Sequence, residues 1–182
     1  MKLYEHMEAH LGAIAQGWGP PQGSNFGIQV SLFEHTPESG INTFCTLGLS
    51  DYVLAIGQKQ VRQELLFGVP STYSADSIAS FLMTFAESVA ASQNGLLRGE
   101  VVEGLPLIEG VATTGIYAAI PVFWPDELHV FESSSPKTVF VWLLPIGRAE
   151  AEIIASKGWN YFEDYLEEAE VDFWDLDRLS LF

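Results

Sequence analysis

The sequence predicts a single α+β domain with a central, largely antiparallel or mixed β-sheet covered by helices. Its 182 residues match the size of one domain, and 48% of them are apolar, so the chain can bury a substantial core. The candidate elements follow the order helix, strands, helix, strands, helices, which is typical of the α+β class. No internal repeat, low-complexity tract or linker interrupts this order, so we predict one domain over residues 1–182.

The first part of the chain predicts one helix followed by three strands. Residues 3–16 have helical periodicity, with apolar residues at positions i, i+4, i+8 and i+11: Leu3, Met7, Leu11 and Ile14. The breaker-rich "GWGPPQGSN" at 17–25 predicts a connection. The β-prone runs 27–35 and 41–49 flank the turn-like "TPESG" and predict a hairpin, and 61–70 predicts a third strand.

A second helix is predicted over 75–93, with Ser74 as its N-cap and Asn94-Gly95 as its stop. Its apolar stripe consists of Ile78, Phe81, Leu82, Phe85 and Val89.

The remaining strands and helices are predicted in the last third of the chain. "GIYAAIPVFW" at 115–124 is the clearest strand of a Gly-rich region, and "LHVFES" and "KTVFVWLLPI" predict an antiparallel pair. The apolar run 139–144 lacks alternation, which predicts a central strand covered on both faces. Helices follow over 147–157 and 161–169: Gly158 is expected to end the first, and Asn160 with Glu163 to cap the second.

Charge is the most informative bulk property. Twenty-four acidic and eight basic residues give a formal net charge of −16. Nucleic acids and anionic membranes are bound mainly through Lys and Arg, so both are excluded as expected partners. A basic protein would be attracted by the long-range field, although acidity can also serve solubility alone.

Three further observations favour a cytoplasmic protein. The apolar runs, such as 139–146, fall far short of the ~20 residues that cross a bilayer. The N-terminus mixes charges and lacks the features of a secretory signal. The single cysteine forms no internal disulfide, which suits a reducing compartment.

The stretch "CTLGLSDYVL" offers two candidate nucleophiles, Cys45 and Ser50. A nucleophile elbow requires Gly-x-Ser-x-Gly, but Tyr52 occupies the last position, so we expect Ser50 to be a turn or strand-end residue. Cys45 lies in an apolar β-prone run, where a buried, inert thiol is expected. We therefore assign no catalytic residue.

No cofactor or metal site is predicted. His6 and His10 are spaced i, i+4, but Met7 stands where the zinc-protease base must be, and a solvated helix face with incidental histidines is the simpler interpretation. The glycines form neither a Walker loop nor a dinucleotide fingerprint.

The C-terminal segment "WNYFEDYLEEAEVDFWDLDRLSLF" combines acidic and aromatic residues. We predict that it binds a basic protein surface, with apolar anchors at the centre and charges at the rim. The candidate partner-binding residues are Glu163, Asp164, Glu167, Glu168, Glu170, Asp172, Trp174, Asp175 and Asp177. In the alternative, Trp159, Phe162 and Leu166 pack on the sheet while the carboxylates simply face water. Calcium is a weaker option, because the spacing does not follow an EF-hand loop.

Four segments in succession resemble the Suppressor of fused-like domain family: "FCTLGLSDYVL", "VRQELLFGVP", the helix 75–93 and "KTVFVWLLPIGRAEAEIIASKGW". The last has an apolar strand ending in Leu-Pro-Ile, a helix with Glu150 and Glu152, and then Gly158-Trp159. The resemblance covers roughly residues 28–170. It implies an α+β fold and a non-enzymatic binding role. Animal relatives sequester a transcription factor and carry a further C-terminal domain, whereas many bacterial relatives look like immunity proteins that neutralise toxins.

The first hypothesis is therefore a bacterial immunity protein that occludes a toxin. The alternatives are a small-molecule enzyme, such as a hydrolase using Ser50 or Cys45, and a regulatory adaptor with a cellular protein partner.

Overall fold

The computed structural model describes residues 1–104 and 107–182 and confirms the α+β class. The α-helices of these residues are α1 (Leu3–Leu11), α2 (Ala75–Ser92), α3 (Arg148–Lys157) and α4 (Trp159–Glu168). The strands are β1 (Gln16–Trp18), β2 (Gln29–Phe33), β3 (Ile41–Leu47), β4 (Leu54–Ile56), β5 (Lys59–Pro70), β6 (Val101–Val102), β7 (Gly115–Ala119), β8 (Val130–Phe131) and β9 (Thr138–Ile146). Two short 3-10 helices, η1 (Leu49–Asp51) and η2 (Asp126–Leu128), complete the described elements.

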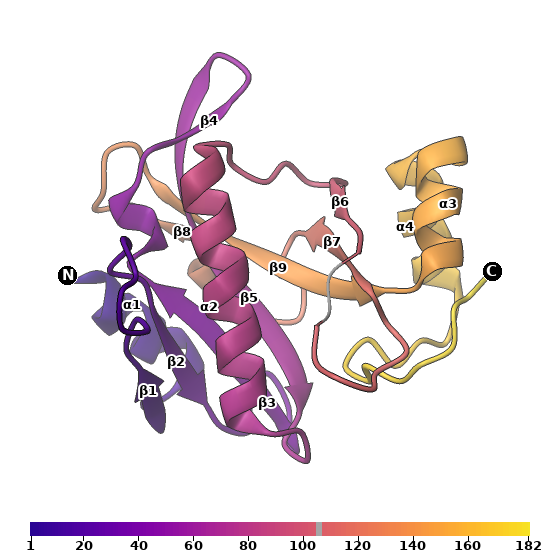
Figure 1. Cartoon of the computed structure of the whole chain (residues 1–182), viewed down its shortest axis with the longest axis horizontal. Coiled ribbons are helices and arrows are strands. Elements are labelled where there is room, and N and C mark those ends of the chain that lie inside the picture. Colours follow the sequence, from indigo (N-terminus) through magenta and orange to yellow (C-terminus); the bar gives the residue numbers. More distant parts are fainter. Residues whose placement is uncertain (105–106) are drawn as a thin grey trace.

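The sheet is mixed, with the strand order β1-β2-β3-β5-β9-β7-β6. Its single parallel pair among the described strands is β5 with β9, in which Leu65 lies opposite Val141. The other pairs are antiparallel, including the predicted hairpin of β2 with β3 and the predicted pairing of β8 with β9. The crossover between the two parallel strands contains α2, which lies across one face of the sheet (Figure 1).

Strand β9 lies between β5 and β7, as its continuous apolar run predicts. Val141 and Leu143 pack in the core under α2, on one face of the sheet. Trp142 and Leu144 point to the opposite face, where the core also includes Phe162 of α4. Because both faces of β9 are buried, its sequence cannot alternate between apolar and polar residues.

Helices α3 and α4 lie together at the end of the molecule opposite α1, and the C-terminal segment runs back from them towards the sheet (Figure 1). Ser74 caps α2 as predicted, with its Oγ accepting a hydrogen bond from the Ser77 N–H at 3.3 Å. Within the described residues, none of the helices has the length and apolar character that a membrane crossing requires.

Several predicted boundaries are wrong near the N-terminus and at the end of α2. Helix α1 ends at Leu11, not residue 16, because Gly12 adopts a φ of 93° that leaves the helix. The expected connection at 17–25 contributes its first residues to β1, which pairs with β2. Helix α2 ends at Ser92, one residue earlier than predicted, because Gln93 takes the left-handed conformation with a φ of 59°.

Two further corrections concern the region that later forms a pocket. The predicted strand 115–124 ends at Ala119, since Pro121 lacks the N–H that a longer ladder requires. Helix α4 begins directly after Gly158. Asn160 is therefore not its N-cap, and Glu163 does not complete the predicted capping box.

Candidate functional site

The two candidate nucleophiles do not form an open catalytic arrangement. Cys45 has no exposed surface, and its thiol contacts the Thr46 carbonyl at 3.3 Å. Burial, with a smaller effect from the Glu64 charge, raises the pKa of the Cys45 thiol well above its usual value. Ser50 is 7% exposed in η1, and its N–H donates to Glu64. No hydrogen bond within the described residues joins either side chain to a histidine.

His6, the first histidine of the α1 pair, is structural rather than solvated. His6 is buried, and its Nε2 lies 3.2 Å from the carbonyl oxygen of Leu128. The ring packs against Phe131 and Phe140, and desolvation lowers the pKa of His6. Thus the solvated-face interpretation is wrong for His6. The described parts of the chain contain no group of three or more His, Cys, Asp or Glu side chains arranged to hold a metal.

The acidic C-terminal residues occupy α4 and the segment after it, and Glu163 faces inward. Its carboxylate accepts hydrogen bonds from the Tyr117 hydroxyl at 2.6 Å and from Arg98 Nε at 3.1 Å. Burial and then Glu163 raise the pKa of Tyr117, and the hydrogen bonds to Glu163 raise the pKa of Arg98. Glu163 therefore ties α4 to the sheet and to the loop before β6.

The carboxylates after α4 also hold the C-terminal segment against the body of the protein. Asp175 and Asp177 both accept from the Tyr73 hydroxyl at 3.2 Å, and Asp177 also accepts from the Ala112 N–H. Burial, followed by Asp177 and Asp175, raises the pKa of Tyr73 to about 12. Asp172 accepts the Trp174 N–H at 3.0 Å.

Trp174 lies inside the protein, where only 7% of it is exposed. Its indole donates to Glu38 Oε1 at 2.7 Å. In this conformation the indole supports neighbouring aromatic rings instead of projecting from the surface.

Four of the predicted partner-binding residues are exposed and make no ion pair or side-chain hydrogen bond within the described residues. They are Asp164, Glu167, Glu168 and Glu170. All belong to α4 or follow it directly, so they concentrate negative charge at one end of the molecule (Figure 1). Of the residues in the alternative interpretation, Phe162 is buried, whereas Trp159 is 38% exposed.

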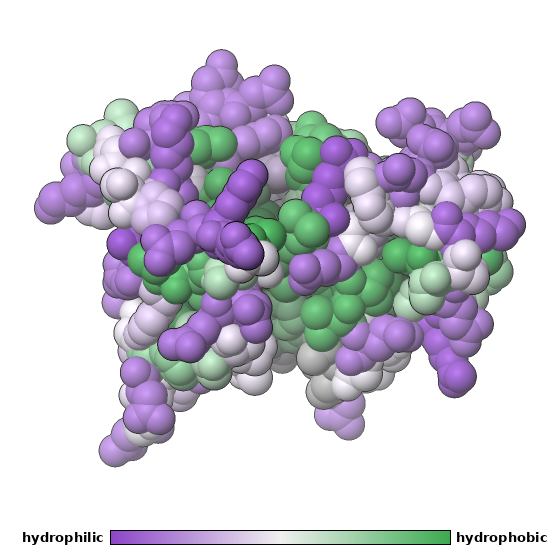
Figure 2. Space-filling model, turned by 90° about the horizontal axis from the view of Figure 1, so that it is seen from above, coloured by the Kyte–Doolittle hydropathy of each residue, from purple (hydrophilic) through white to green (hydrophobic). Residues whose placement is uncertain are grey.

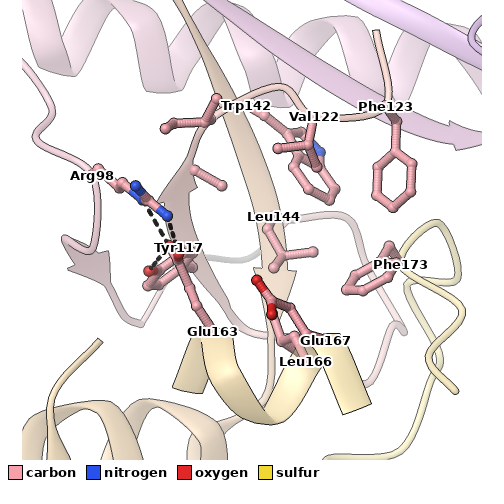
Figure 3. Close-up of a pocket in the computed structure, with 12 residues that line it drawn as sticks. Arg98, Tyr117, Val122, Phe123, Trp142, Leu144, Glu163, Leu166, Glu167 and Phe173 are labelled. Carbon is pink, nitrogen blue, oxygen red and sulfur yellow. Dashed lines mark hydrogen bonds and ion pairs between the residues drawn. The ribbon is translucent and has the colours of Figure 1, made fainter. Parts of the chain in front are cut away.

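A pocket of about 280 Å³ lies between α4, the strands β7 and β9, and the loop after β7. Figure 3 shows Arg98, Tyr117 and Glu163 on one side of it and Phe123 and Phe173 on the other. Its other lining residues include Val122, Trp142, Leu144, Leu166 and Glu167. The pocket is thus an apolar hollow with carboxylates on its α4 side.

The loop after β7 brings aromatic residues to this pocket. Phe123 is 43% exposed, and its ring centroid lies 5.4 Å from that of Trp142 and 5.3 Å from that of Phe173. Val122 beside it is 64% exposed. Elsewhere, apolar surface also reaches the solvent between hydrophilic side chains, as the face in Figure 2 shows. Sequence reasoning missed this loop, because it assigned residues 120–124 to a strand.

These features define a protein class with a mixed α+β sheet, a clustered acidic surface and an adjoining apolar pocket. The chain belongs to the Suppressor of fused (SUFU) family, whose family-wide sequence pattern matches residues 25–179. The predicted resemblance is therefore confirmed.

Among curated proteins, the chain is similar to the immunity protein YqcF of Bacillus subtilis (strain 168). The two are 26% identical over 161 residues, which cover 86% of this chain and 83% of YqcF.

Solved structures confirm the Suppressor of fused-like fold. A SUFU homologue from Neisseria gonorrhoeae matches with a TM-score of 0.80 at 18% identity, covering 98% of this chain and 93% of that one. A chain of the Sufu–Fu complex matches with a TM-score of 0.74 at 12% identity, covering 99% and 89%. Drosophila Suppressor of Fused gives 0.65 at 14% identity, covering 88% of this chain and 44% of the larger protein.

Proposed function

We propose that this protein is a non-enzymatic binding domain of a bacterial cytoplasm, and specifically an immunity protein that neutralises a toxin by sequestering it. The observation that carries the proposal is the joint presence of an exposed acidic face on α4 and an apolar, aromatic pocket beside it. Membership of the SUFU family and the similarity to an immunity protein support it. The buried Cys45 and Ser50 offer no competing open catalytic site.

The partner in this proposal is a basic protein. The net charge of −16 and the exposed carboxylates near α4 accelerate its encounter, because opposite charges steer diffusion. The aromatic pocket then slows dissociation, since large apolar side chains buried at the centre of an interface dominate its affinity. Nucleic acid and anionic membranes would be repelled by the same field.

The decisive experiment identifies the partner and then tests toxicity. The protein is purified from its native cells at low salt, and a basic protein that co-purifies in near-stoichiometric yield is identified by mass spectrometry. That protein is expressed alone and together with the present one. Growth arrest that co-expression relieves is the expected result.

Two outcomes would contradict the immunity role. A partner that is harmless when expressed alone would indicate a regulatory adaptor, which would use the same surface. A toxin whose effect persists despite a demonstrated complex would show that binding does not neutralise it.

A further inference from the structure

Phe123 and Phe173 line two hollows near the C-terminal segment. One is the pocket of about 280 Å³ described above. The other, of about 470 Å³, is lined by Glu38, Asp172 and neighbouring apolar residues. Both hollows include the two phenylalanines in their walls. Each hollow also has carboxylates in its lining.

The carboxylates of the first pocket differ in what they already bind. Glu163 is paired with Arg98, and their charges compensate each other. Glu167, one turn further along α4, lines the same pocket and makes no ion pair or side-chain hydrogen bond in the described chain. The pocket therefore retains one uncompensated negative charge beside its apolar walls.

The pocket wall also contains an unused hydrogen-bond donor. Trp142 is buried, and its indole N–H is one of the few buried polar groups of the described structure that lack a hydrogen-bond partner. In Figure 3 the indole lies beside Phe123, with its nitrogen towards that ring. A buried donor without a partner is unfavourable. The nitrogen itself is covered, so a ligand acceptor such as a backbone carbonyl gains this contact when the partly exposed Phe123 ring shifts aside.

The protein already uses the same chemistry for a cation of its own. The guanidinium carbon of Arg98 lies 4.9 Å from the ring centroid of Trp159, while its nitrogens bind the Glu163 carboxylate. An aromatic face and a carboxylate together hold a guanidinium well, because it stacks on rings and forms paired hydrogen bonds. Glu167 with Phe123 and Phe173 offers a second such combination, and Arg98, the cation that lines the same pocket, forms its ion pair with Glu163.

Building on the proposed function, we propose that this pocket receives an arginine side chain of the basic partner. Its aliphatic part lies against Phe123, Phe173 and Leu144, its guanidinium pairs with Glu167, and the adjoining backbone carbonyl is available to the Trp142 N–H. At about 280 Å³ the pocket is slightly smaller than the roughly 300–1,000 Å³ of ordinary small-molecule sites, which favours a single side chain over a larger ligand.

The test uses a small probe and does not require the partner. N-acetyl-arginine amide is titrated into ¹⁵N-labelled protein, and the indole N–H signal of Trp142 is followed by NMR after assignment with Trp142→Phe. The neutral N-acetyl-norleucine amide has a similar apolar stem without the charge. We expect saturable, millimolar binding of the arginine probe that shifts the Trp142 signal, and weaker binding of the norleucine probe.

A matched pair of variants isolates the role of Glu167. Glu167→Gln should weaken arginine binding by about threefold or more, as expected for loss of one charge-assisted contact. Asp51→Asn removes the same charge from an exposed position in η1, which does not line the pocket, and should leave the affinity within about twofold. Circular dichroism confirms that both variants remain folded.

Three results would overturn the arginine pocket: no saturable shift of Trp142, equal affinity for both probes, or equal weakening by both variants. Each leaves the proposed sequestration intact, because complex formation with a partner is measured separately. Conversely, arginine binding without a protein partner would support the pocket while removing the support for immunity.

Discussion

Glu64 is a carboxylate with no exposed surface, and its surroundings act on its pKa in opposite directions. Its Oε1 accepts from the N–H groups of Gly48 and Ser50 at 2.9 and 3.0 Å, which favours the ionised form. Desolvation is the larger effect and raises the pKa of Glu64 to about 7. The carboxyl group thus closes the turn after β3 while resisting ionisation.

This residue makes stability depend on pH in a defined window. In the unfolded chain the carboxyl ionises near pH 4.5, as an ordinary glutamate does, but in the folded protein only near pH 7. The folded state therefore binds more protons between these values, so the contribution of Glu64 is full below pH 4.5 and is lost as pH rises to about 7. The loss amounts to about 3 kcal/mol. This pH dependence should be absent in Glu64→Gln. The free energy of unfolding of the wild type minus that of the variant should therefore fall as pH rises from about 4.5 to about 7. A constant difference, from urea unfolding, would contradict this assignment.

Arg178 and Glu150 form a second buried charge site, with Arg178 Nη1 at 2.6 Å from Glu150 Oε1. Arg178→Met would leave the Glu150 carboxylate buried without its cation, and we expect a loss of about 3–5 kcal/mol in the free energy of unfolding. Adding Glu150→Gln should recover much of it. Arg148→Met is the control, since its pair with Glu152 is exposed and contributes about 1 kcal/mol or less. Chemical denaturation of the variants distinguishes these cases; equal losses at Arg178 and Arg148 would contradict the prediction.

At the scale of elements, the C-terminal segment docks on β5 because Gly68 leaves room for Trp174. A Cβ atom at position 68 would lie 2.6 Å from Trp174 Cζ3, far inside contact distance. Gly68→Ala should therefore cost about 1–3 kcal/mol and change the near-ultraviolet circular dichroism of the tryptophans. In a Trp174→Ala background the same substitution should cost much less, because the clash is absent. Gly27→Ala, where nothing lies within 4 Å of the added atom, is the control. Equal costs in both backgrounds would contradict this docking.

Most elements could be predicted because their signals are local. Ser74 as the cap of α2 and the apolar run of β9 are examples that depend on a few neighbouring residues. The parallel pairing of β5 with β9 could not be predicted, since it joins residues such as Gln63 and Val139 that are far apart in the chain. The end of β7 was missed, although Pro121, which has no backbone N–H, indicated that the strand could not continue through it.

At the scale of the whole molecule, the sequence predicted that acidic residues cluster near the C-terminus, but not which of their carboxylates remain free to contact a partner. Glu163 pairs with Arg98, 65 residues earlier, and Asp177 binds Tyr73, 104 residues earlier. Such partners are determined by the folded chain alone, so sequence could not separate them from the exposed Glu167 and Glu168. The pocket was missed for the same reason, because its walls come from the β7 loop, β9, α4 and the C-terminal segment.

The distribution of charge gives the last prediction, which concerns the rate of complex formation. Reversing Glu167, Glu168 and Asp172 to Lys should slow association with a basic partner and reduce its dependence on salt, because exposed charges near the interface steer the encounter.

Salt screens charges over about 8–10 Å at physiological ionic strength, so reversing a charge far from the interface should change the association rate less. Asp51→Lys in η1, beside β4 on the side of the molecule away from α4 (Figure 1), should therefore change the rate less than Glu168→Lys. Stopped-flow association at several salt concentrations measures both effects. Equal slowing by these two single reversals would mean that net charge acts without regard to position, and unchanged rates in the triple variant would remove α4 and its acidic extension from the binding mechanism.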